Sequence, residues 1–316
     1  MTFGSISESK MIPQLAGTDE ELCLLGVTRL AQYIDFVRHR TSGGEGRDDG
    51  EIADEWRAAA DVYASLQAAA TAPPAMPEIK ELPAVIQTHV DLLVKLPQFR
   101  RAFASVPIAF GMVELDKLIV YQHELTLSTV NALRASLPTP LTDAALAAAC
   151  LPLDQTSADF RVGRSGKREF VFHSDSHDMR FLGAQLIEPS KVPELVTDGF
   201  TSAVIALAVG FSNNVLNVVR YDNRVVLNNG YHRAYALRSL GVRHAPCVIQ
   251  VCRHWEDVTL AGSSEMTQNA DLYFSTQRPP QLLDFFDGAL TRRFATRPQR
   301  RQLHLKIDVA STKIEM

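Results

Sequence analysis

The sequence predicts an α+β protein in which an all-helical N-terminal domain, residues 1–105, precedes a mixed-sheet α+β domain, residues 106–316. Two observations support this division. Apolar residues recur at helical spacing in the first third, whereas short runs rich in β-branched and aromatic residues dominate from Pro107 onward. A hydrophobic fraction of 46% is that of an ordinary globular protein with a core of its own.

The first third reads as three helices. Leu22, Leu25 and Leu30 begin a run at three-to-four spacing, and residues 52–70 form a second run rich in Ala, Leu and Glu. The prolines of TAPPAMP end that second helix, because proline lacks an amide donor and disfavours helix before it. A third helix is predicted over residues 82–103, with a bend near Pro97.

The remaining two-thirds alternates strands with a few helices. The run DFRVGRSGKREFVFHS predicts a hairpin about Ser165-Gly166. A helix over residues 231–240 is expected to end at Gly241, a residue favoured just beyond helix C-termini. Further strands are predicted over residues 179–187, 203–211, 215–221, 224–227, 245–252 and 302–309.

Charge and cysteine content narrow the functional classes. A net charge of -4 argues against a surface built throughout to hold nucleic acid. The four cysteines form no CxxC pair, which fits a reducing compartment. The longest apolar stretch, about residues 203–211, is roughly half of what a membrane-spanning helix needs. We therefore expect a cytoplasmic protein without a membrane partner.

The segment from Val225 to Val248 carries the clearest chemical pattern. A predicted strand ends in Asn228-Asn229-Gly230, and a predicted helix follows at once. The first amides of a helix have no internal partner and lie at the positive end of its dipole, so they favour an anion. His232 and Arg233 add donors suited to phosphate oxygens. The alternative is a tight turn whose Arg233 pairs with a nearby carboxylate.

The run VVLNNGYHRAYALRSLGVRHAPCVI resembles the motif of the ParB/sulfiredoxin-like superfamily, and VELDKLIVYQHEL resembles its opening strand and turn, nearest the free serine kinase branch. The resemblance spans about residues 113–251, with roughly fifty residues more than usual between the motifs, and it implies an insertion around residues 140–200. It implies a nucleotide cofactor, ATP, ADP or CTP with Mg2+, and Glu124 as the base that deprotonates an acceptor hydroxyl. His123 flanks Glu124, and His232 is a second candidate for stabilising developing charge. The implied nucleotide-binding residues are Asn229, Gly230, Tyr231, His232 and Arg233.

The chain departs from each branch of that superfamily. Asn229 replaces the acidic residue of the kinase turn, which weakens the case for kinase chemistry. Tyr231 stands where sulfiredoxin has its reactive cysteine, which excludes that reaction. The segment Tyr121-Gln122-His123-Glu124 lacks the arginine expected of partition proteins that bind cytidine triphosphate.

Two other segments offer competing sites. In HSDSHD, the side chains of His173, Asp175 and His177 would share one face of a strand and so suit zinc or ferrous iron. Short clusters of this kind are more often polar loops. Five arginines between Arg292 and Arg301 offer nucleic acid a basic loop, but such runs are more often solvated surface.

Three functions remain open from the sequence. The favoured one is an enzyme of phosphoryl transfer or nucleotide hydrolysis acting on a small molecule, because Glu124 is retained. The second is a non-catalytic nucleotide-binding regulatory or nucleic-acid-associated protein, which Asn229 favours. The third is a metal-dependent enzyme that uses His173, Asp175 and His177.

Overall fold

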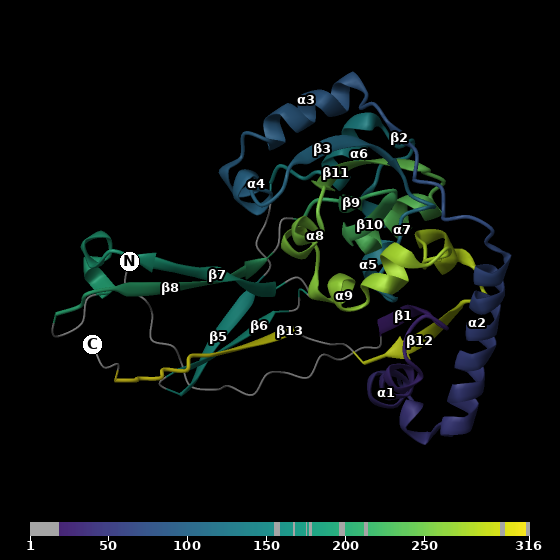
Figure 1. Cartoon of the computed structure of the whole chain (residues 1–316), viewed down its shortest axis with the longest axis horizontal. Helices are drawn as coiled ribbons and strands as arrows, with labels where there is room; N and C mark the ends of the chain where they lie inside the picture. Colours follow the sequence, from purple (N-terminus) through teal and green to yellow (C-terminus); the bar gives the residue numbers. More distant parts are fainter. Residues whose placement is uncertain are drawn as a thin grey trace. The chain divides into compact units, whose positions relative to one another are not determined.

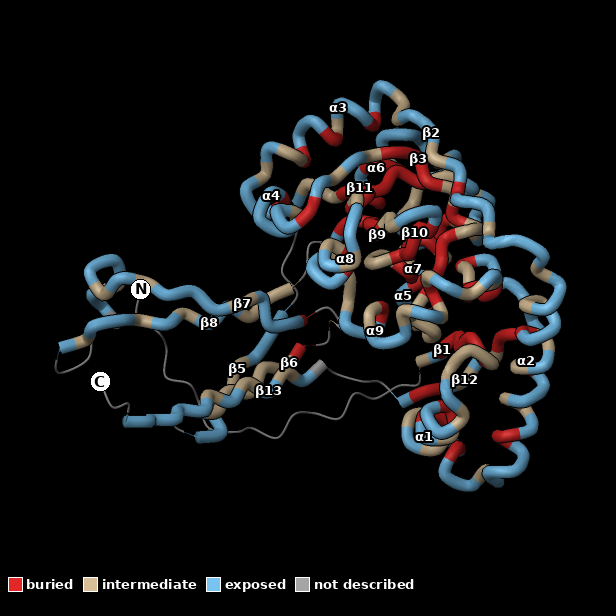
Figure 2. The backbone as a smooth tube through the Cα atoms, in the orientation of Figure 1, coloured by how far each residue is buried: buried red, intermediate tan, exposed pale blue. Residues whose placement is uncertain are grey.

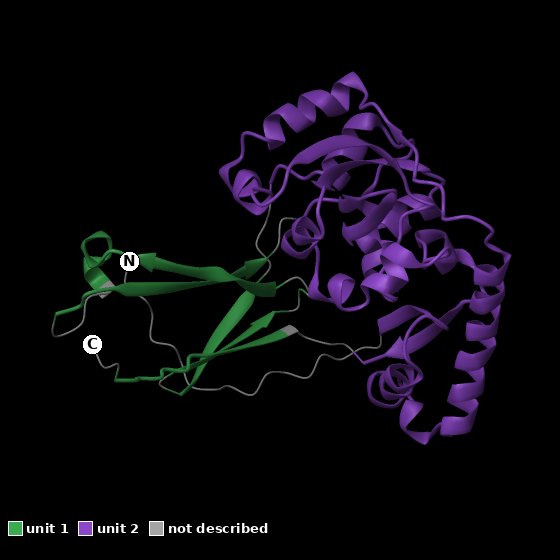
Figure 3. Cartoon of the chain, in the orientation of Figure 1, with its two compact units in different colours: residues 1–15, 156–212, 299–316 green, residues 16–155, 213–298 purple. Residues whose placement is uncertain are grey.

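The structure is a computed structural model, and the residues it describes are 19–154, 159–166, 168–174, 176, 179–195, 200–211, 214–297 and 301–313. It has the predicted α+β composition, with helices and several sheets (Figure 1). The chain divides into two compact units, and both are discontinuous in sequence (Figure 3). Unit 2 comprises residues 16–155 and 213–298, and unit 1 comprises residues 1–15, 156–212 and 299–316.

This division differs from the predicted boundary at residue 105. The N-terminal third shares a unit with most of the α+β region, and the segment that separates from it lies at 156–212 rather than 140–200. Nor is the N-terminal third all-helical: strand β1, Asp19–Leu24, lies where the spacing of Leu22 and Leu25 predicts a helix. β1 is the centre of a sheet whose other strands come from residues 124–126 and 291–296. The expectation fails because those partners are distant in sequence.

Unit 2 is built on a five-stranded sheet of order β10-β9-β11-β3-β2. Only the β11–β9 pair is parallel, and the other three pairs are antiparallel. A three-stranded antiparallel sheet, β12-β1-β4, completes its β structure. The strands are β1 (Asp19–Leu24), β2 (Ile79–Lys80), β3 (Ile108–Glu114), β4 (Glu124–Thr126), β9 (Asn217–Tyr221), β10 (Arg224–Asn229), β11 (His244–Cys252) and β12 (Thr291–Thr296).

The helices of unit 2 include both long and single-turn segments. Asp48 caps the longest, α2, by accepting hydrogen bonds from the amides of Gly50 and Glu51. The predicted bend near Pro97 is a break, since α3 ends before α4 begins at that proline. The α-helices are α1 (Leu30–Arg40), α2 (Asp49–Ala69), α3 (Ala84–Leu93), α4 (Pro97–Ala102), α5 (Leu127–Ser136), α6 (Asp143–Cys150), α7 (Tyr231–Ser239), α8 (Trp255–Ala261) and α9 (Ser264–Gln268). Shorter turns are η1 (Gly44–Gly46), η4 (Asp271–Ser275) and η5 (Leu282–Phe286).

Buried residues concentrate in the strands of the large sheet (Figure 2), and they form cores on its two sides. Val225 and Leu227 of β10 face the main core with helix α7, whereas Val226 between them faces a second core that contains α8 and α9. This alternation is what a period of two requires. This packing holds the end of β10 and the start of α7 in place.

Unit 1 consists of two small antiparallel sheets. The predicted hairpin is present as β5 and β6, and the predicted final strand pairs with it as β13. The predicted strands at 179–187 and 203–211 pair with each other as β7 and β8. The elements are β5 (Phe160–Gly166), β6 (Glu169–Ser174), β7 (Met179–Ile187), η2 (Pro189–Lys191), η3 (Pro193–Leu195), β8 (Val204–Phe211) and β13 (Arg301–Lys306).

Candidate functional site

The turn between β10 and α7 has the predicted strand–turn–helix form. Gly230 has φ +97°, in the left-handed region that favours glycine, and α7 begins at the next residue. A side chain at this position would also collide with Leu216, whose Cδ1 would lie 2.7 Å from the added Cβ. Glycine is therefore required here both by backbone conformation and by packing.

The start of α7 holds backbone donors that its own hydrogen-bond ladder does not use. The first helical bond runs from the amide of Ala234 to the carbonyl oxygen of Gly230 at 2.8 Å, so the amides of residues 231–233 precede the ladder. The amide of Gly230 donates to Asn229 Oδ1 at 2.9 Å. The Asn229 side chain thus already stabilises the turn, in addition to any role towards a ligand.

Arg233 is the most unusual side chain of the turn. Arg233 is only 7% exposed, and its Nη2 donates to Asn214 Oδ1 at 2.8 Å. Its Nε and Nη1 are inaccessible to solvent and have no hydrogen-bond partner among the residues that the structure describes. Burial lowers the pKa of this guanidinium, which shows the cost of placing it there. The expected alternative, a pairing of Arg233 with a carboxylate, is wrong for the described part of the chain.

Tyr231 is a structural member of the turn. Its hydroxyl donates to the carbonyl oxygen of Leu227 at 2.6 Å and accepts from the amide of Tyr121 at 3.1 Å. Burial raises its pKa well above the ordinary value, so the phenol stays neutral. The side chain therefore points into the core and leaves only its backbone for a ligand.

His232 connects the turn to the second predicted motif. Its Nε2 accepts a hydrogen bond from the amide of Thr126 at 3.0 Å, so Nδ1 carries the proton of a neutral ring. Thr126 is the last residue of β4, which begins at Glu124. The two segments that resemble superfamily motifs, more than one hundred residues apart in sequence, thus meet at the start of α7.

His123 lies just before β4. Its Nε2 is shielded from solvent and lacks a hydrogen-bond partner among the described residues. Burial lowers the pKa of the imidazole to about 4, so the ring is uncharged near neutral pH. Any role of His123 in stabilising charge would therefore depend on hydrogen bonding rather than on a positive charge.

Glu124 forms an ion pair that the sequence does not reveal. Arg40, at the end of α1, donates from Nη1 to Glu124 Oε2 at 2.6 Å. Its Nη2 also contacts both carboxylate oxygens of Glu21, at 3.0 and 3.1 Å. Burial raises the pKa of Glu21, and the Arg40 charge acts against that rise. Arg40 thus bridges two carboxylates on neighbouring strands, and no spacing rule links residues 21, 40 and 124.

The competing metal site is only partly described. His173 lies on β6, opposite Arg161 and Gln302, whereas Asp175 and His177 lie outside the described residues. Within the described part of the chain, no group of three or more histidine, cysteine, aspartate or glutamate side chains is arranged to hold a metal ion.

The arginine-rich segment begins with surface ion pairs. Arg292 donates to Glu55 at 3.0 Å and Arg297 to Glu45 at 2.7 Å. Arg300 and the side chain of Arg301 lie outside the described residues. At least two of the five arginines therefore have acidic partners within the protein, as expected of a solvated surface.

Comparison with protein-family models, with curated proteins and with solved structures finds no match to this chain. Across the residues that the structure describes, every helix is too short or too polar to cross a bilayer.

Proposed function

We propose that the chain binds the phosphate of a nucleotide, or of another phosphorylated small molecule, at the turn formed by Asn229 to Arg233. The observation that carries the proposal is the buried Arg233 guanidinium, whose Nε and Nη1 have no hydrogen-bond partner among the described residues. A buried charge without partners costs several kcal/mol in general, and natural proteins keep such groups mainly where a ligand or partner satisfies them. Two phosphate oxygens would satisfy both nitrogens once the atoms that cover them move aside, and the adjacent helix amides favour the same anion.

The resemblance to the ParB/sulfiredoxin-like superfamily extends this proposal to a reaction. Phosphoryl transfer or nucleotide hydrolysis would use Glu124 as general base, and the bond between Thr126 and His232 supports a site shared by β4 and α7. The residues fit the phosphate part of ATP, ADP or CTP. Bound Mg2+ is held largely by phosphates with one or two carboxylates, and it would neutralise charge on them; no cluster of three protein ligands is required.

A non-catalytic binding protein is the second candidate function. It is favoured by the Arg40–Glu124 ion pair, because the guanidinium occupies a carboxylate oxygen that a general base would use to accept a proton. Asn229, whose side chain is used within the turn, supports the same function. In this alternative, nucleotide binding without turnover would change the affinity for a small-molecule or nucleic-acid partner.

Phosphate binding is tested by thermal unfolding with phosphate, pyrophosphate, ADP, ATP and CTP, with and without Mg2+. We expect a ligand to raise the midpoint of the wild-type protein and to have no effect on Arg233→Met. Arg224→Met is the matched control, because Arg224 is also buried with an unpartnered nitrogen but lies at the start of β10. No shift with any of these ligands, or an equal loss in both variants, would reject the proposal.

Catalysis is tested separately with the nucleotide that binds. The catalytic function would be supported if the wild-type protein releases phosphate and Glu124→Gln binds the nucleotide without releasing phosphate. Binding without release in the wild-type protein would support the regulatory function.

A further inference from the structure

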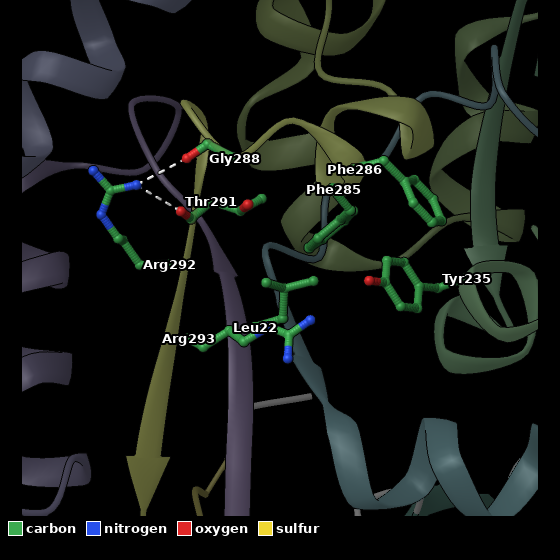
Figure 4. A pocket seen from close by; sticks show the side chains of 8 residues that line it. All are labelled: Leu22, Tyr235, Phe285, Phe286, Gly288, Thr291, Arg292 and Arg293. Atoms are coloured by element: carbon green, nitrogen blue, oxygen red, sulfur yellow. Dashed lines mark hydrogen bonds between the residues drawn. The ribbon is translucent and has the colours of Figure 1, made fainter. Parts of the chain in front are cut away.

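A second candidate site lies in an open cleft of about 450 Å³ on unit 2 (Figure 4). Its walls come from β1, from α7 and from the stretch 285–293, which includes parts of η5 and β12. This size falls within the range of small-molecule sites. The cleft involves the second turn of α7, at Tyr235, rather than the Gly230 turn.

One wall is aromatic and rigid. Tyr235 and Phe286 stack with ring centroids 4.6 Å apart, and Phe285 meets the edge of Tyr235 at 6.2 Å. Arg238 lies 5.6 Å from the Phe286 ring and is itself held by Asp116. Because these contacts hold the rings in place, the wall is suited to receive an apolar or aromatic group.

The opposite side is cationic. Arg292 is satisfied by Glu55 and by the carbonyl oxygens of Gly288 and Thr291. The next residue, Arg293, points towards the space in front of Tyr235 in Figure 4 and forms no ion pair or hydrogen bond with the described residues. Among the residues that the structure describes, Arg134 of α5 also has no side-chain partner.

Both arginines lie close enough to Tyr235 to affect its ionisation. Burial raises the pKa of Tyr235, and the charges of Arg293 and Arg134 oppose that rise. The Tyr235 hydroxyl points away from Phe286 into the cleft (Figure 4). The Arg293 guanidinium and the Tyr235 phenol thus line one space whose other wall is apolar, which matches the requirements of an acid carried on a hydrophobic body.

We infer that this cleft binds a small organic acid, with its aromatic or apolar body against Phe285 and Phe286 and its acid group between Arg293 and the Tyr235 hydroxyl. The inference is independent of the phosphate site proposed at Gly230. Carboxylates and phosphate monoesters share the required chemistry, because a guanidinium fork binds either group with two hydrogen bonds.

The test is calorimetric titration of the full chain with phenylacetate, phenyl phosphate and the neutral analogue phenylacetamide. We expect the acids to bind and the amide to bind at least about 10-fold more weakly, because it lacks the charge-assisted bonds. Arg293→Gln should weaken acid binding by about 10-fold. Arg101→Gln, an exposed arginine of α4, is the matched control and should bind like wild type.

A second measurement reports on the site directly. Bound acid would offset the positive charges near Tyr235, so it should raise the pKa of that phenol in an ultraviolet titration, and Tyr235→Phe should remove the change. Equal affinity for acid and amide, no binding below about 10 mM, or acid binding unaffected by Arg293→Gln would overturn the inference. If only Arg233→Met abolished phenyl phosphate binding, the ligand would bind at the Gly230 turn. This result would also overturn the inference.

Discussion

The hydroxyl of Tyr231 lies 3.1 Å from the amide nitrogen of Tyr121 and accepts its hydrogen bond. The same hydroxyl donates to Leu227, so one buried phenol connects the end of β10, the start of α7 and the segment that leads to Glu124. The relative placement of the two motif-bearing segments therefore depends on this residue as well as on His232.

We predict that Tyr231→Phe lowers the free energy of unfolding by about 1–3 kcal/mol, because it leaves a buried amide and a buried carbonyl oxygen without their partner. Urea unfolding at pH 7 measures the change. Tyr235→Phe is the control, since that half-buried hydroxyl has no partner among the described residues, and it should cost less than about 0.5 kcal/mol. Similar losses in both variants would contradict the bridging role of Tyr231.

Alanine substitutions at two glycines with positive φ distinguish the cost of backbone strain from the cost of steric overlap. Gly230→Ala meets both a left-handed φ and the Leu216 side chain, whereas Gly241→Ala, at φ +86°, has open space around the new Cβ. We expect Gly241→Ala to lower the free energy of unfolding by about 1–2 kcal/mol. Gly230→Ala should lower it by about 1–3 kcal/mol more, because the new methyl group overpacks against Leu216. Chemical denaturation of the two variants gives the difference. An equal cost would mean that Leu216 moves aside without penalty.

Burial of His123 predicts acid sensitivity. The folded pKa of about 4 lies below the ordinary histidine pKa of 6.5, so the unfolded chain binds the proton more readily. The stabilising contribution of the neutral ring is complete above pH 6.5 and is lost as the pH falls towards 4, by at most about 3 kcal/mol. His123→Gln should show a smaller loss of unfolding free energy between pH 7 and 4.5 than wild type. His39→Gln, at an exposed position, should keep the wild-type difference.

The sequence predicted the turn well and the surroundings of Glu124 poorly, for physical reasons. Local signals define β10, Gly230, α7 and Gly241, because a strand end, a left-handed glycine and a helix stop are each set by neighbouring residues. Strand β1 has no such signal. Leu22 and Leu24 face one core while Cys23 and Leu25 face another, and this two-sided burial exists only once α1, α2, β4 and β12 are assembled.

The Arg40 contacts are a consequence of the same assembly. They require β1 and β4 to pair in the register that places Cys23 opposite Glu124, with the C-terminal end of α1 beside them. The residues come from positions 21, 40 and 124, so only tertiary structure could reveal the cluster. Its effect on Glu124 is open to experiment through Arg40.

We predict that Arg40→Gln lowers the free energy of unfolding by about 2 kcal/mol at pH 7, because it leaves Glu21 and Glu124 close together without their shared cation. Arg40 opposes the rise in the Glu21 pKa, so its removal raises that pKa further. A carboxyl with a raised folded pKa binds its proton more readily in the folded state, and the variant should therefore recover stability relative to wild type as the pH falls from 7 to 5. Urea unfolding at the two pH values measures this recovery.

The control is Arg38→Gln, which removes an exposed ion pair with Asp49 and should lower the free energy of unfolding by less than about 1 kcal/mol at both pH values. Because Glu124→Gln removes one of the two charges, adding it to Arg40→Gln should restore part of the loss; a purely additive double variant would show that the carboxylates do not repel each other.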